Sequence, residues 1–469
     1  GTLQINSDSS LGAAPVSANN NILLTNGGTI LASGQSAAFT VNANRGIFLY
    51  TGGGVLANNS SSYSMTVAGP ITGSTGLTIG TAGNTGTVNL GGANTYTGGT
   101  AVSYGTLQAG STTAFGAAAS AITVSSGAAL DVNGKTMANA NALTINGSGI
   151  GSNGALTNSA AAAGTYIGAI TLGGNAAIGS SSGNLTVSGG ITGAANLTLK
   201  ANGSGAITLS STTVNNTGTI TNSGSGSGSV TISAAIGSNV TNLTQNGTSS
   251  LVLSFNNAYT GATTISNGTL AAAAATALST GALTIGSTGV LDLTYNGTVT
   301  LGSTLSMSSG SSVTNSANTS NLYVTGASTL AGTINTLGNQ TYYGATVLAA
   351  DTTITTLNGA TNTNGVITFS STVNGTAATE TLIINNGSGS VTFGGNVGTT
   401  TALGSLNISG LSGSPVAQTT TLNGNVTTAG NQSYGGNLLL SSNTALDSSS
   451  GGANGAITIS GNIDSSSLT

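Results

Sequence analysis

The chain has 469 residues, of which 76 are Gly, and only 2 % of its residues are charged. It contains no His, Cys or Trp, which excludes Ser-His-Asp and Cys-His nucleophile systems, thiol redox chemistry and disulfides. Its three Lys or Arg residues cannot neutralise a phosphate backbone, so nucleic acid is excluded as a partner. The mean hydropathy of +0.26 indicates a chain that buries apolar surface and does not stay disordered.

The first residues, Gly1-Thr2-Leu3-Gln4, recur later as Gly105-Thr106-Leu107-Gln108. We therefore expect the chain to begin partway through a structural repeat. No basic segment followed by a hydrophobic stretch marks a signal peptide at this end. Apolar runs also stay below the roughly 18 residues that a transmembrane helix needs, so we expect no membrane-spanning segment.

The clearest repeat unit lies between residues 94 and 107. Its markers recur without gaps 163 positions later, which predicts one structural unit used twice. The markers are Asn94, Tyr96, Gly98, Gly105 and Leu107 in the first copy and Asn257, Tyr259, Gly261, Gly268 and Leu270 in the second. An apolar segment with one carboxylate follows each copy, at Asp131 and at Asp292. These equivalent positions indicate a structural role for both carboxylates.

Triplets of an apolar residue, Thr and another apolar residue run along the whole chain, bounded by Gly, Asn or Ser. Period-2 alternation predicts short strands with the two apolar side chains inside and Thr outside. The triplets are Leu77–Ile79, Ile122–Val124, Leu143–Ile145, Ile170–Leu172, Leu185–Val187, Leu197–Leu199, Ile207–Leu209, Val230–Ile232, Leu283–Ile285 and Val391–Phe393. Gly and Asn supply the corners between the strands.

A second repeat type occupies the C-terminal third. Asn339-Gln340-Thr341-Tyr342 recurs as Asn431-Gln432-Ser433-Tyr434. The chain stops at Ser467-Leu468-Thr469, in a further strand-like segment. Both ends of the chain thus look like cuts in a longer array.

Repeat spacing predicts the fold. After each first-type unit, the next apolar segment follows at a distance of about one solenoid turn. The two-residue turns that would join neighbouring strands into the hairpins of a β-sandwich are missing. We therefore predict an all-β fold, a right-handed parallel β-helix (β-solenoid) forming a single elongated rod, with coils stacked about 4.8 Å apart. The change of repeat type predicts two regions, a solenoid over residues 1–300 and its continuation over residues 301–469.

The stretch from Leu90 to Gln108 resembles the autotransporter-associated β-strand repeat, also called the passenger-associated transport repeat. The second copy has Gly261-Ala262 in place of Gly98-Gly99. The units at Asn339 and Asn431 are similar to repeats of filamentous-haemagglutinin-like giant exoproteins. These resemblances imply a right-handed β-helical passenger that is exported across the outer membrane of a Gram-negative bacterium, by an autotransporter or a two-partner route. Such passengers are displayed or released as adhesins, filaments or biofilm components.

No catalytic, metal or cofactor site is predicted. General acid–base catalysis needs two converging carboxyl groups and Ca²⁺ needs several oxygens, whereas no two carboxylates lie within ten residues in sequence. An isopeptide bond from Lys135 or Lys200 is not expected with so few cations. Thr arrays that order ice need regular spacing, and the Thr triplets fall at irregular intervals.

The repeat tyrosines Tyr96, Tyr259, Tyr342 and Tyr434 have two interpretations: packing inside the coils, which we favour, or an exposed face for glycans or proteins. We expect a non-catalytic extracellular segment of a large bacterial surface protein that forms a stalk, filament or coat. The expected partners are further coils, by end-to-end self-association or a longer array, and surface glycans or proteins. The alternatives are a polysaccharide-acting β-helix enzyme and a glycan- or receptor-binding adhesin module.

Overall fold

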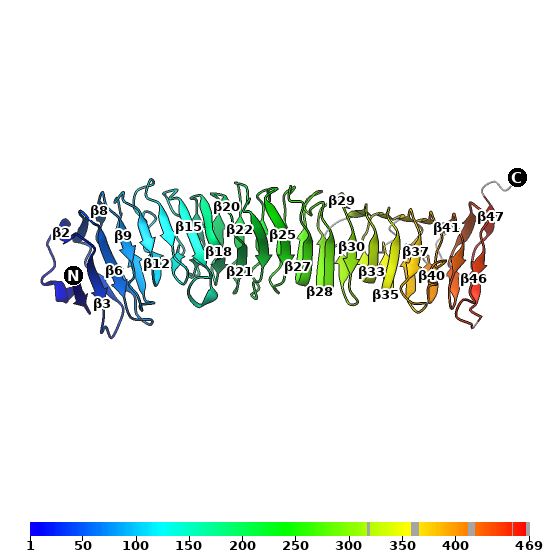
Figure 1. Ribbon diagram of the computed structural model, residues 1–469, viewed down its shortest axis with the longest axis horizontal. Coiled ribbons are helices and arrows are strands. Elements are labelled where there is room, and N and C mark those ends of the chain that lie inside the picture. The colour runs from blue at the N-terminus through cyan, green and yellow to red at the C-terminus, as the bar shows by residue number, and fades with distance from the viewer. Residues whose placement is uncertain (317–318, 358–364, 411–417, 453, 466–469) are drawn as a thin grey trace. The chain divides into compact units, whose positions relative to one another are not determined.

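The computed structural model describes residues 1–316, 319–357, 365–410, 418–452 and 454–465 (Figure 1). The chain divides into two compact units: unit 1 comprises residues 1–241 and 247–250, and unit 2 comprises residues 242–246 and 251–469. Helical structure in the described ranges consists of two 3-10 turns, η1 (Asp8–Leu11) and η2 (Ile150–Ser152). No helix found there is long and apolar enough to cross a membrane.

Unit 1 consists of three ladders of parallel strands, named A, B and C. Ladder A stacks β1 (Thr2–Ile5), β3 (Gly28–Ala32), β6 (Gly54–Asn58), β9 (Leu77–Ile79), β11 (Thr100–Val102), β13 (Ile122–Val124), β15 (Leu143–Gly147), β18 (Ile170–Ser180) and β20 (Ile191–Gly193). Ladder B contains β2 (Asn19–Leu24), β5 (Arg45–Leu49) and β8 (Ile71–Gly73), and, further along the chain, β17 (Gly164–Tyr166), β19 (Leu185–Val187), β22 (Ile207–Leu209) and β24 (Val230–Ile232). Ladder C stacks β4 (Phe39–Val41), β7 (Met65–Val67), β10 (Thr87–Leu90), β12 (Thr106–Ala109), β14 (Ala129–Asp131), β16 (Leu156–Asn158), the end of β18, β21 (Leu197–Ala201) and β23 (Gly218–Asn222).

Unit 2 also has three parallel ladders, named D, E and F. Ladder D stacks β25 (Val240–Gln245, of which residues 242–245 belong to unit 2), β27 (Thr263–Ala272), β28 (Leu283–Leu293), β30 (Leu305–Met307), β33 (Ser328–Asn335), β35 (Thr346–Thr355) and β37 (Val373–Gly375), and β42 (Val426–Thr427) and β45 (Leu446–Asp447) follow. Ladder E stacks β26 (Leu251–Leu253), the ends of β27 and β28, β31 (Ser312–Thr314), the ends of β33 and β35, β38 (Thr381–Asn385), β40 (Ser405–Ser409), β43 (Gln432–Tyr434) and β46 (Ile457–Ile459). Ladder F stacks β29 (Thr298–Leu301), β32 (Asn321–Val324), β34 (Gln340–Tyr342), β36 (Ile367–Phe369), β39 (Val391–Phe393), β41 (Thr419–Leu422), β44 (Asn437–Leu440) and β47 (Ile463–Ser465).

The predicted all-β solenoid is confirmed, with about 19 turns counted over the parts of both units that the structure describes. All ten predicted triplets lie in strands, each with its first and third residues buried and its Thr facing outward. Apolar contact with the coils above and below therefore forms the core of each unit. The expected strand-like segment at Ser467–Thr469 lies outside the described residues. The expected change of repeat type near residue 300 falls within unit 2, and this boundary stays a prediction.

Thr residues that are irregularly spaced in sequence become regularly stacked in space. In ladder A, the register places Thr123, Thr144, Thr171 and Thr192 directly over one another. Loops absorb the differences in coil length, so strand register is independent of loop length. Each triplet contributes a single outward Thr, and the resulting column is one Thr wide.

Candidate functional site

Asn94 and Tyr96 lie at the corner between β10 and β11 of unit 1. The Asn94 Oδ1 atom accepts a hydrogen bond from the Ile71 N–H group of the preceding coil at 2.8 Å, and its Nδ2 atom donates to the Ala114 carbonyl of the following coil at 2.6 Å. The Tyr96 hydroxyl hydrogen-bonds the Thr100 Oγ1 atom at 2.6 Å. Both side chains are buried. One corner thereby ties three successive coils together.

The second copy repeats this geometry in unit 2. The Asn257 Nδ2 atom donates to the Ala277 carbonyl at 2.6 Å, and the Tyr259 hydroxyl hydrogen-bonds the Thr263 Oγ1 atom at 2.7 Å. Ala114 and Ala277 are separated by the same 163 positions as the two asparagines. The repeated sequence therefore forms the same asparagine and tyrosine hydrogen bonds at both corners.

The repeat glycines and leucines follow the corner asparagine and tyrosine in each copy. Gly105 and Gly268 both have a φ of +70°, a left-handed conformation that favours glycine. A Cβ atom on Gly105 would also lie 2.5 Å from the Gly86 carbonyl oxygen of the neighbouring coil. Leu107 and Leu270 are fully buried. Gly98 packs against the Thr75 backbone, and the Gly261 carbonyl accepts a hydrogen bond from Ser279 Oγ at 2.7 Å.

A family model described as passenger-associated-transport-repeat matches residues 81–109 and 243–272, the segments that contain these two corners. The chain carries two passenger-associated-transport repeats. This confirms the resemblance of the stretch from Leu90 to Gln108 to the passenger-associated-transport repeat, and such repeats with a β-solenoid fit an autotransporter passenger segment. Comparison with curated proteins and with solved structures gives no match.

Outside the passenger-associated-transport repeats, Tyr342 and Tyr434 are held by a different motif. The Tyr342 hydroxyl donates to Gln340 Oε1 at 2.9 Å, and the Tyr434 hydroxyl donates to Gln432 Oε1 at 3.0 Å. All four side chains are buried in strands, β34 of ladder F and β43 of ladder E. We call these strands the Gln-x-Tyr strands.

The asparagine that precedes each Gln-x-Tyr strand links neighbouring coils. The Asn339 Oδ1 atom accepts a hydrogen bond from the Val366 N–H group at 2.8 Å. The Asn431 Oδ1 atom accepts one from the Ala456 N–H group at 2.8 Å. Each asparagine thus holds the backbone of the coil that follows it.

A stack of aromatic rings fills the core behind ladder F. The Tyr342 and Phe369 ring centroids are 5.0 Å apart with planes inclined by 13°, and those of Phe369 and Phe393 are 5.3 Å apart and inclined by 3°. All three rings are buried. Stacked rings add attraction beyond the apolar area that they bury.

All four repeat tyrosines are buried at 0–1 % exposure. Burial raises the pKa of the Tyr96, Tyr259, Tyr342 and Tyr434 hydroxyls above the ordinary value, because the protein interior disfavours the phenolate. A binding face made by these four rings, the less favoured interpretation of the sequence, would require exposed rings. These positions therefore lie in the packing between coils.

The two carboxylates that follow the passenger-associated-transport repeats both brace the next coil. Asp131 accepts hydrogen bonds from Ser159 Oγ at 2.5 Å and from the Ser159 N–H group at 3.1 Å. Asp292 accepts equivalent bonds from Ser316 Oγ at 2.5 Å and from the Ser316 N–H group at 2.9 Å. Asp131 also continues a polar column in ladder C, since it accepts from Gln108 Nε2 at 3.0 Å.

The other charged side chains are dispersed. Lys200 Nζ donates to the Ser152 carbonyl at 3.0 Å, and the Thr381 N–H group donates to Asp351 at 2.8 Å. Burial raises the pKa of Glu380, but hydrogen bonds from the Thr376 hydroxyl and from backbone N–H groups, including that of Ala377, outweigh this effect and lower it overall. Within the described ranges, no three acidic side chains come together to form a metal site.

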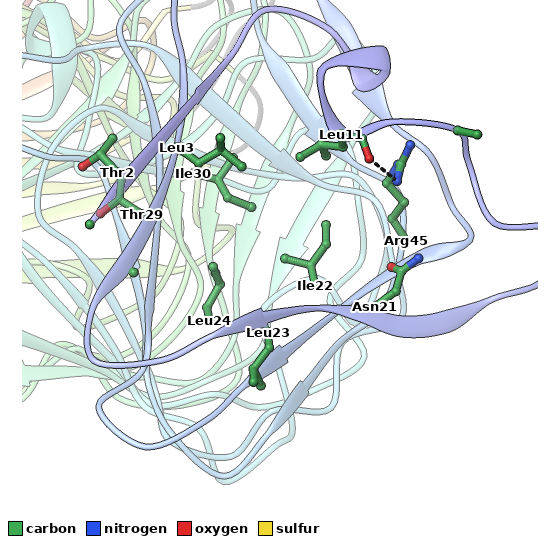
Figure 2. Close-up of a pocket in the computed structure, with 13 residues that line it drawn as sticks. Thr2, Leu3, Leu11, Asn21, Ile22, Leu23, Leu24, Thr29, Ile30 and Arg45 are labelled. Carbon is green, nitrogen blue, oxygen red and sulfur yellow. Dashed lines mark hydrogen bonds between the residues drawn. The ribbon is translucent and has the colours of Figure 1, made fainter.

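A hollow of about 780 Å³ lies beside β1, β2 and β3 in unit 1 (Figure 2). Leu3, Ile22, Leu24 and Ile30 supply its apolar lining. At its rim, Arg45 pairs with Asp8 at 2.9 Å and donates to the Leu11 carbonyl at 3.2 Å. The shape and lining suit an apolar strand or coil better than a charged small molecule.

One surface feature was missed in the sequence. Tyr323 and Tyr343 project from ladder F, with ring centroids 6.2 Å apart and planes inclined by 80°. Alternation within β32 is a signal for Tyr323, because Leu322 and Val324 are buried and the residue between them faces outward. Tyr343 directly follows β34 and its buried last residue, Tyr342.

Proposed function

We propose that this chain is a structural and adhesive segment of an autotransporter passenger, displayed outside a bacterial cell as a stalk, filament or coat. The observation that carries the proposal is the pair of passenger-associated-transport repeats built into parallel ladders. Such repeats occur in autotransporter passenger domains, which are exposed at the cell surface. Continuous backbone ladders give a segment of this kind mechanical persistence.

The proposed role is non-catalytic. Four of the carboxylates accept hydrogen bonds from a neighbouring coil or loop: Asp131 and Asp292 from serines, Glu380 from Thr376, and Asp351 from Thr381. Catalysis by a pair of carboxyl groups would need two of them to converge on one bond. The observed partners favour bracing between and within coils.

Surface display is testable with the few amines of the chain. Intact cells producing the full protein are treated with a membrane-impermeant amine-reactive label, and labelling of Lys135 and Lys200 is read by mass spectrometry. Both side chains are partly exposed, so we expect labelling before lysis. Labelling that appears only after lysis would contradict the proposal, and a periplasmic protein labelled only after lysis serves as the control.

Coil-on-coil stacking is the proposed mode of association. Within the described residues, β1 is paired along one edge, with β3, and the apolar hollow beside it (Figure 2) can receive a further coil. The purified chain is expected to form end-to-end assemblies in analytical ultracentrifugation. Leu3→Lys together with Ile22→Lys should weaken them, whereas Thr78→Lys, on the outer side of ladder A, should not. A monodisperse monomer at all concentrations would contradict this association.

A further inference from the structure

The outer surface of ladder F combines an aromatic pair with a row of hydroxyl groups. Tyr343 is 50 % exposed, and its ring meets that of Tyr323 edge to face. Phe48 and Tyr50 also form a ring pair, 6.3 Å apart, but within one coil of unit 1, whereas Tyr323 and Tyr343 lie on adjacent coils. An exposed aromatic surface of this kind is informative about binding.

The strand register places a line of threonines on both sides of Tyr323. The outward row along ladder F reads Thr300, Tyr323, Thr341, Thr368, Thr392 and Thr421. Each of these side chains is partly exposed. Their spacing follows the strand spacing of a sheet, about 4.8 Å. The row therefore presents hydroxyl groups at a regular interval, with the aromatic pair next to one end.

Charge is scarce on this surface. Every residue from Thr300 to Thr421 in the row is neutral, and the aspartate of the row, Asp464, lies at its far end beyond Leu439. A surface without charge does not attract phosphate, uronate or sulfate groups. The ligand that it complements is accordingly uncharged.

We propose that the Tyr323–Tyr343 surface binds a neutral polysaccharide chain lying along the threonine row. The C–H face of a sugar ring is apolar and stacks on the electron-rich face of an aromatic ring. Its hydroxyl groups exchange hydrogen bonds with Thr hydroxyls, which both donate and accept. A linear polymer meets the tyrosines once and the regularly spaced threonines several times.

A protein partner fits this surface less well. A stable protein interface buries about 800 Å² on each side around an apolar core. Apart from the two rings, the row consists of threonines that expose both methyl and hydroxyl groups. This composition favours the repeated weak contacts of a polymer over a compact hot spot.

The test uses the purified full chain in native gels that contain a neutral glucan (β-1,4-, β-1,3- or α-1,4-linked) or, as the charged counterpart, polygalacturonate. We expect at least one neutral glucan to retard the chain and Tyr343→Ala to raise the apparent Kd about tenfold, the loss that corresponds to one aromatic contact. Tyr343→Phe should retain most of the binding because it keeps the ring. Thr341→Val should weaken binding less than Tyr343→Ala does.

Tyr104→Ala is the matched control, since Tyr104 is 44 % exposed but lies in unit 1. Circular dichroism checks that each variant is folded. The proposal is overturned if no neutral glucan retards the chain, if Tyr343→Ala binds as tightly as the parent, or if only polygalacturonate binds. Tyr343-dependent binding of a protein without glucan binding would also overturn it. The proposal deepens the adhesive role proposed above, but the gel assay does not depend on surface labelling, so either can fail while the other stands.

Discussion

The passenger-associated-transport repeats and the Gln-x-Tyr strands bury a tyrosine hydroxyl in different surroundings. Tyr96 lies at a corner, and its hydroxyl meets Thr100 at the start of the next strand. Tyr342 lies within a strand, and its hydroxyl meets Gln340, two residues earlier on the same inward face. The second arrangement needs another buried amide, and Gln340 in turn donates to the Thr355 carbonyl at 3.0 Å.

The two kinds of buried tyrosine show that a repeated motif determines its local hydrogen bonds but not its ladder. Asn94 and Asn257 keep the same bond to the following coil. Tyr342 and Tyr434 keep the same bond to a glutamine but lie in ladders F and E. A short motif therefore fixes local bonding, while its ladder depends on how many strands and corners precede it.

The largest expected effect is a loss of stability at alkaline pH, where ionisation of the buried tyrosine hydroxyls disrupts both arrangements. Burial raises the pKa of Tyr96, Tyr166, Tyr259, Tyr342 and Tyr434 above the ordinary value of about 10. Above pH 10 the unfolded chain loses these protons while the folded chain retains them, so stability is lost as pH rises through the folded pKa values. Denaturant unfolding is expected to be nearly independent of pH up to about pH 9 and then to weaken steeply. A folded chain in which all eleven tyrosines ionise near pH 10 would contradict the shared burial.

Much of this fold could be predicted from residue patterns. Triplets such as Leu143–Ile145 specify a strand, its inward side chains and its outward Thr, because alternation is a local property. The ladder of each motif could not be predicted. Thr2–Gln4 lies in ladder A, although the similar Thr106–Gln108 lies in ladder C. The ladder depends on how many strands and corners precede the motif, so it cannot be assigned from one motif alone.

For the site residues too, the local direction of a side chain could be predicted from the sequence, but its partner in another coil could not. The sequence shows Asp131 and Asp292 to be equivalent, but their serine partners, Ser159 and Ser316, lie in the next coil, 28 and 24 residues further along the chain. Such partners depend on register, which sequence spacing alone does not give. The outward direction of Tyr323, in contrast, follows from alternation with its buried neighbours.

Removal of the tyrosine hydroxyl should destabilise the Gln-x-Tyr strand more than the corner of the passenger-associated-transport repeat. Tyr342→Phe leaves the Gln340 Oε1 atom without this donor in the core, and we expect a loss of about 1–3 kcal/mol. Tyr96→Phe leaves the Thr100 hydroxyl, which can rotate toward another acceptor, so a loss of about 0.5–1.5 kcal/mol is expected. Hydrogen exchange of the flanking strands measures both local stabilities, with the exposed Tyr104→Phe as the control. Equal losses at both sites would remove the distinction.

Asparagine removal compares the two passenger-associated-transport repeats. Asn94→Ala leaves the Ile71 N–H group and the Ala114 carbonyl without their partner at a buried corner, with an expected loss of about 1–3 kcal/mol. Asn257 is partly exposed, and water can replace part of its bonding. We therefore expect Asn257→Ala to cost about 0.5–1.5 kcal/mol. Hydrogen exchange at the following coil provides the measurement, and a larger loss at Asn257 would show that burial does not set the order.

The smallest expected effect lies at acid pH, in unit 2. The pKa of Glu380 is lowered from its ordinary 4.5, and hydrogen bonds from Ser449 lower the pKa of the exposed Asp447. Groups with a lowered folded pKa contribute stability that is present above their unfolded pKa and is lost as pH falls through the folded value. Stability should therefore fall only slightly below about pH 4.5, and Glu380→Gln should remove part of that fall. Because the described residues contain one ion pair, Arg45 with Asp8, added salt should change the unfolding midpoint little at pH 7. A steep acid transition unaffected by Glu380→Gln would mean that carboxylates, and not buried hydroxyls, govern how this solenoid responds to pH.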